Sequence, residues 1–91
     1  MALGAAQVEE DRHARAVETY RLVLARDELH EEALRALMAS HAALGDRTLA
    51  MRAYQRFAER LKRELEAEPS RETRALFERL QSGQGPQVAS R

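Results

Sequence analysis

The stretch Ala16-Val-Glu-Thr-Tyr20 returns 34 residues later as Ala50-Met-Arg-Ala-Tyr54. Each copy places a small residue four positions before a tyrosine, so on a helix the two side chains lie on the same face. The same spacing separates Arg26 from Arg60, Leu3 from Leu37 and Ala5 from Ala39. A repeat of this length predicts stacked helix pairs.

The chain between and around these copies has the apolar spacing of amphipathic helices. Apolar side chains recur at i, i+3 or i+4 and i+7, and glycine and proline interrupt the pattern at few positions. The predicted helices span residues 12–26, 31–44, 47–66 and about 70–82. Gly45 is predicted to end the second helix in the left-handed conformation, and Ser70 to cap the last. Residues 2–10 could belong to a preceding helix.

Composition restricts the class of protein. With 91 residues the chain is long enough for one domain, and its 15 basic and 15 acidic side chains cancel. A zero net charge argues against a nucleic-acid binder. There is no cysteine, no secretory signal and no apolar run long enough to cross a bilayer, so we expect a cytoplasmic all-α domain.

The repeat resembles the tetratricopeptide repeat. In that repeat the small residue and the aromatic four positions later lie on the second helix of each pair, which are the roles that Ala16 and Tyr20, then Ala50 and Tyr54, would take. Glu28 and Lys62 stand where the repeat usually has a proline after the second helix. The resemblance implies antiparallel helix pairs stacked as a right-handed superhelix of about four to five helices.

A sharper resemblance covers Asp11 to about Leu80. Its segments are Arg15-Ala-Val-Glu-Thr-Tyr-Arg-Leu-Val-Leu-Ala-Arg-Asp27, His30-Glu-Glu-Ala-Leu-Arg-Ala-Leu-Met38, Leu44-Gly-Asp-Arg47, Tyr54 to Glu64 and Glu68-Pro-Ser-Arg-Glu-Thr-Arg-Ala-Leu-Phe-Glu-Arg-Leu80. Together they are similar to the bacterial transcriptional activator domain, the tetratricopeptide-like part of Streptomyces antibiotic regulatory proteins. The junction at Glu68-Pro69-Ser70 is the most distinctive.

Two departures from that family occur near the junction. The family usually has a glycine shortly before it, where this chain reads Leu65-Glu66-Ala67, and Arg71 replaces a common proline. The resemblance implies a regulatory interaction domain at residues 1–82, truncated at its N-terminus, whose DNA-binding domain is missing. Residues 83–91 are predicted to be a disordered tail.

Catalytic, metal and cofactor sites have no support in the sequence. No two of His13, His30 and His41 have the i, i+3 or i+4 spacing of a helical metal site, and no nucleophile is paired with a base. We therefore predict that the protein is not an enzyme and needs no cofactor.

Interaction sites are predicted on two faces. An arginine row on the third helix could meet an acidic partner or phosphate, or be a solvated face neutralised by Glu59, Glu64 and Glu66. The row is Arg52, Arg56, Arg60 and Arg63. In a tetratricopeptide pair the first helix lines a concave groove, which here would suit a docked helix. Its predicted residues include Arg35, Ala39 and Ala42.

The predicted partners are proteins: the chain's own DNA-binding domain, a second subunit or the transcription machinery. A truncated stack exposes an apolar end, so we expect a homodimer with Leu3 and Val8 at the contact. Two alternatives stay open. One is direct DNA binding by a helix-turn-helix at residues 31–65, against which Glu31 and Glu32 argue. The other is a generic tetratricopeptide scaffold or co-chaperone fragment.

Overall fold

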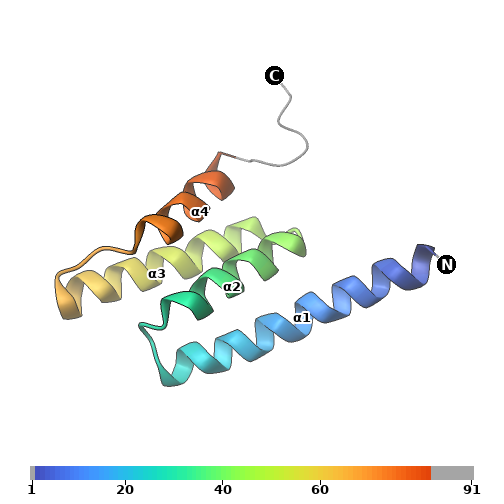
Figure 1. Cartoon of the computed structure of the whole chain (residues 1–91), viewed down its shortest axis with the longest axis horizontal. Coiled ribbons are helices and arrows are strands. Elements are labelled where there is room, and N and C mark those ends of the chain that lie inside the picture. Colours follow the sequence, from blue (N-terminus) through green and yellow to red (C-terminus); the bar gives the residue numbers. More distant parts are fainter. Residues whose placement is uncertain (1, 83–91) are drawn as a thin grey trace.

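The computed structural model describes residues 2–82, with side chains from residue 7 onward, and this part of the chain is entirely helical with its connecting turns. Its helices are α1 (Ala2–Arg26), α2 (Glu31–Ala43), α3 (Arg47–Leu65) and α4 (Arg71–Gln81). They lie side by side in chain order, each running back along the one before it (Figure 1). The predicted all-α fold of stacked helix pairs is confirmed.

Helix α1 is longer than predicted. It runs without a break through 25 residues, so the idea that residues 2–10 belong to a preceding helix is wrong. The segment has no proline, and a single glycine at Gly4 costs a helix only about 1 kcal/mol. Leu3 and Leu37 therefore do not occupy equivalent helices, whereas Ala16 and Ala50 do, since they lie in α1 and α3.

The helix ends follow local chemistry. Gly45 has φ of 83°, as predicted for the left-handed residue after α2. The predicted cap of α4 is also confirmed, because the Ser70 hydroxyl accepts a hydrogen bond from the backbone N–H of Thr73 at 3.4 Å. At the start of α2 the imidazole of His30 caps the helix instead of a serine or aspartate, accepting from the N–H of Ala33 at 3.1 Å.

The end of α3 uses an unusual residue. Glu66 adopts the left-handed conformation, with φ of 51°, at the position that closes this helix. Side chains with a Cβ disfavour this region by about 1 kcal/mol, which is why glycine is the usual choice there. A glycine at this position would avoid that cost, and this chain makes the turn with Glu66 instead.

The core lies between α2 and α3. Its buried members are Leu34, Met38, Ala50, Phe57 and Leu61. Helix α4 covers one edge of this core, where Phe77 stacks on Tyr54 with ring centroids 4.1 Å apart and planes 12° from parallel. Within residues 2–82, no helix has both the length and the apolar character to span a membrane.

Candidate protein-interaction groove

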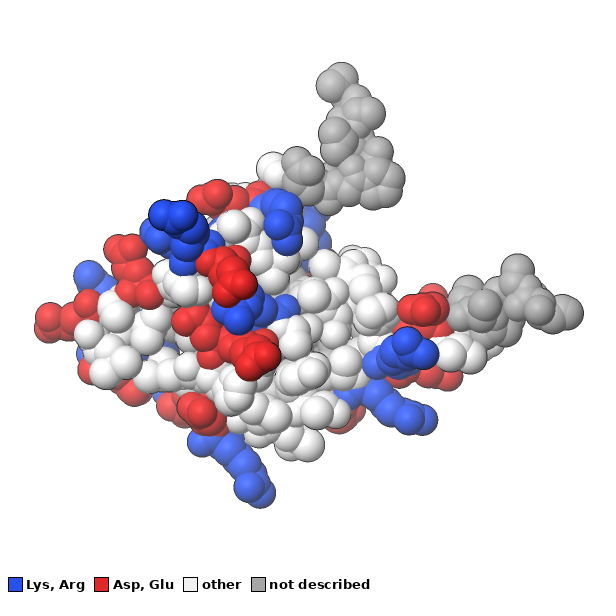
Figure 2. All heavy atoms as spheres, in the orientation of Figure 1, with Lys and Arg blue, Asp and Glu red and all other residues white. Residues whose placement is uncertain are grey.

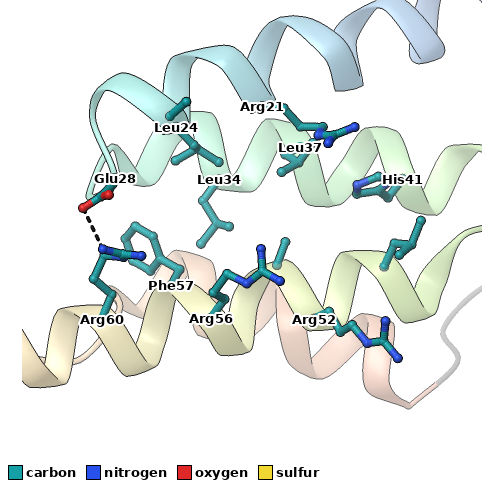
Figure 3. Close-up of a pocket in the computed structure, with 13 residues that line it drawn as sticks. Arg21, Leu24, Glu28, Leu34, Leu37, His41, Arg52, Arg56, Phe57 and Arg60 are labelled. Atoms are coloured by element: carbon teal, nitrogen blue, oxygen red, sulfur yellow. Dashed lines mark hydrogen bonds and ion pairs between the residues drawn. The ribbon is translucent and has the colours of Figure 1, made fainter.

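A groove of about 520 Å³ runs between α1 and α3. It exists because, in the part of the chain that the structure describes, both helices pack against α2 but not against each other, so α2 forms the floor. The apolar side chains that line it are Leu24, Leu34, Leu37, Leu49, Phe57 and the alanines Ala25 and Ala53. The charged and polar ones are Arg21, Glu28, His41, Arg52, Arg56 and Arg60 (Figure 3).

Three arginines of the predicted row on α3 line this groove. Arg52, Arg56 and Arg60 recur every four residues and so follow one face of the helix. Arg63 is exposed and lies outside the lining. Arg21 adds a fourth guanidinium group from α1, on the opposite wall. This second wall could not be predicted from the sequence, since it depends on how α1 packs.

The arginines differ in their pairing. Arg60 donates to Glu28 at 2.8 Å across the mouth of the groove and also faces Glu64 at 3.7 Å. Among residues 7–82, Arg52 and Arg56 make no ion pair, and both are exposed. One end of the groove is therefore closed by a charge pair, and the rest carries unpaired positive charge.

His41 adds little charge to this groove. Burial lowers its pKa, Asp46 raises it and Arg21 lowers it again, with a net pKa below the ordinary value of 6.5. The ring is therefore mostly neutral at pH 7, and its Nδ1 atom is buried without a hydrogen-bond partner in the described part of the chain. Among the same residues, no three histidine, aspartate or glutamate side chains converge as a metal site would require.

The other predicted groove residues lie outside this groove, since Arg35, Ala39 and Ala42 are absent from its lining. Arg35 is engaged by α4: it donates to Thr73 Oγ1 at 2.9 Å and faces Glu72 at 3.7 Å. Ala39 is exposed and Ala42 is half-buried. Of the predicted residues, Arg52, Arg56 and Arg60 therefore line this groove, whereas Arg35 contacts α4 instead.

A polar cluster joins α2 to the start of α4. Glu31 accepts a hydrogen bond from the backbone N–H of Ser70 at 2.6 Å, and Thr73, which is fully buried, receives the Arg35 bond. Partial burial raises the pKa of Glu31, but hydrogen bonds from Thr73 and Ser70 and the charge of Arg35 outweigh it. The pKa of Glu31 is therefore below its ordinary value of 4.5.

This cluster makes stability depend on pH. A carboxyl whose pKa is lowered by folding stabilises the folded state above its unfolded pKa, and the effect is lost as the pH falls through the folded pKa. Glu31→Gln should therefore unfold at a lower temperature than the wild type at pH 7. The difference between the two unfolding temperatures should become smaller below about pH 4.5. Thermal unfolding of both proteins from pH 7 to pH 3 measures this difference. If the difference stays constant with pH, the charge of the Glu31 carboxylate contributes nothing to stability.

The residues predicted at a dimer contact lie on the first turns of α1. Val8 is 56% exposed and has no role in the core. The side chain of Leu3 lies outside the described residues. In Figure 1 the N-terminal end of α1 reaches well beyond the ends of α2 and α3.

Comparison with known proteins agrees with the resemblance seen in the sequence. A family model described as the bacterial transcriptional activator domain matches residues 1–81. Comparison with curated proteins found no match, and neither did comparison with solved structures. Since the family match extends over nearly the whole chain, from α1 to the end of α4, this protein belongs to the bacterial transcriptional activator domain family.

Proposed function

We propose that this domain regulates transcription without catalysis, by binding other proteins: its own DNA-binding domain, a second subunit or the transcription machinery. The groove between α1 and α3 is the observation that carries the proposal. It combines apolar side chains with exposed arginines along one wall, such as Arg52 and Arg56, which make no ion pair within the described residues. Such a mixture of apolar anchors and fixed charge is typical of a surface that another protein covers.

The distribution of charge supports a protein partner over a nucleic acid. On the face shown in Figure 2, acidic and basic side chains of the described residues are interspersed. The net charge of the whole chain is zero. A duplex binds mainly through neutralised phosphates, which requires a concentrated basic surface. The helix-turn-helix alternative at residues 31–65 would also bring Glu31 and Glu32 to the start of its first helix.

Contact with a second subunit is the form of this function that α1 supports best. Val8 is exposed on a helix end that extends past the rest of the domain, and an apolar side chain in that position is stabilised when a two-fold partner covers it. Leu3 is proposed to share this contact.

A reporter experiment tests the proposal. The whole chain is fused to a DNA-binding domain that occupies its operator only as a dimer, and the operator is placed either over a promoter or upstream of a weak one. Self-association should give repression in the first arrangement, and contact with the transcription machinery should give activation in the second. Val8→Glu should reduce the repression, whereas Gln55→Glu, at a position on α3 that is also exposed, should leave it unchanged.

Two outcomes would overturn the proposal. One is the absence of both repression and activation by a fusion that is stably expressed. The other is a salt-dependent, sequence-preferring shift of duplex DNA by the isolated chain, which would favour the helix-turn-helix reading.

A further inference from the structure

We infer that the groove between α1 and α3 binds an acidic amphipathic helix of a partner protein. The inference rests on the proposed function and names the chemistry of the partner. It follows from three properties of the groove: its shape, its apolar lining and the sign of its unpaired charge.

The shape fits the side chains of a helix. Two helices that flank a third without touching each other leave room above it for a fourth, and packed helix axes lie about 8 to 10 Å apart. On α2, Leu34, Leu37 and His41 line the groove at positions i, i+3 and i+7, so the floor is one stripe along the helix axis. A cavity of about 520 Å³ accepts several side chains of a guest whose backbone stays outside.

The residues that line the groove indicate where the apolar side chains of the bound helix would lie. Leu34 and Phe57 are already buried, with 1% and 5% exposed, and they form the deep surface. Leu49 is 43% exposed at one end of the α3 wall, and Leu24 is half-buried on the α1 wall. A leucine or phenylalanine entering between these two walls would remove apolar surface from water on both sides at once.

The charge determines the sign of the partner. Arg21, Arg52 and Arg56 line the groove from two helices and have no carboxylate partner among residues 7–82, whereas Arg60 is already satisfied by Glu28. In Figure 3 the guanidinium group of Arg56 extends from α3 toward α2, into the gap. Guanidinium groups bind carboxylates with two parallel hydrogen bonds, so glutamate or aspartate beside the apolar anchors would pair with them.

Two other occupants fit less well. Residues 84–91 have no carboxylate side chain with which to complement these arginines. The α1 helix of a second copy has Glu9, Glu10 and Asp11, but in its described part Val8 is the only large apolar side chain beside them. A single anchor would leave most of the apolar lining uncovered.

A binding experiment tests the inference with the full chain. The probe is a labelled synthetic 16-residue helix with leucines at i, i+3, i+4 and i+7 and glutamates beside them; a matched probe has lysines in place of the glutamates. Fluorescence anisotropy should show saturable binding of the acidic probe alone. The double variant Arg52→Glu with Arg56→Glu should weaken it at least tenfold and should gain affinity for the lysine probe, because two attractions become repulsions.

The control is Arg71→Glu with Arg79→Glu, which makes the same change of net charge at exposed positions of α4 outside the groove. Its affinity should stay within about twofold of the wild type, since neither arginine lines the groove and salt screens exposed charges that do not contact the probe. Circular dichroism verifies that both double variants remain helical.

Three results would overturn the inference. The first is equal binding of the acidic and the basic probe, and the second is equal weakening of binding by the groove and the control variants. The third is a peptide of residues 7–15 that binds as tightly as the designed helix, since a second copy of this chain would then be the occupant. If the acidic helix does not bind but the reporter fusion represses or activates, the acidic partner is rejected and the proposed regulatory function is retained. If the fusion neither represses nor activates, the proposed function itself is rejected.

Discussion

Replacing Phe57 with alanine should lower the free energy of unfolding by about 3 to 5 kcal/mol. The ring is 5% exposed and packs in the core between α2 and α3 while also forming the deep surface of the groove. Removing it takes away the transfer free energy of a phenyl group and leaves a cavity that helices can close only in part. Since domains of this size have about 5 to 15 kcal/mol in total, much of the stability would be lost.

Urea unfolding followed by circular dichroism measures the effect. Leu49→Ala is the matched control: Leu49 is on the same helix and lines the same groove, but it is 43% exposed and should lose far less stability. Equal losses for the two variants would contradict the assignment of Phe57 to the core.

The second large loss of stability should come from a larger side chain at a buried position of α3. Ala50 has no exposed surface, and it lies on α3 where that helix faces the core residues of α2. Ala50→Leu would insert three carbon atoms into a filled space and should cost roughly 1 to 3 kcal/mol through displaced side chains and backbone. Thermal unfolding detects such a loss as a lower midpoint temperature.

The same substitution at an exposed alanine separates overpacking from helix propensity. Ala14 lies on α1 and is exposed, so Ala14→Leu should change the free energy of unfolding by no more than about 0.5 kcal/mol. If Ala50→Leu changed the free energy of unfolding as little as Ala14→Leu, Ala50 could not lie at the contact between α3 and α2. The repeat that relates Ala16 to Ala50 would then not correspond to equivalent packing positions.

The helices could be predicted from the sequence because their signals are local. Apolar spacing, Gly45 and the Ser70 cap all act within one or two turns, and the observed ends differ from the expected ones by a residue or so, except at the start of α1. There the sequence contains no stop signal, so only the assumption of a regular repeat suggested a break. The left-handed Glu66 was missed because its conformation is disfavoured for that residue type.

The candidate site could be predicted only in part. The arginine row on α3 follows from helical spacing, and three of its members do line one groove. The bonds from Arg60 to Glu28 and from Arg35 to Thr73 join residues 32 and 38 positions apart. Which partner such a side chain meets depends on how helices cross, and local pattern carries no information about that. The groove itself, as a gap between two helices, has no local signature.

The order in which the helices touch has a consequence for how the domain folds and opens. Within residues 2–82, helix α2 contacts each of the other three, while α1 contacts α2 alone and α4 contacts only α2 and α3. Contacts between neighbours in the chain close small loops, which favours rapid folding, and because the buried core lies between α2 and α3 we expect folding to start with this pair. Amide hydrogens of α2 and α3 should therefore exchange with solvent last, and those of α1 and α4 should exchange through partial openings that leave the central pair intact.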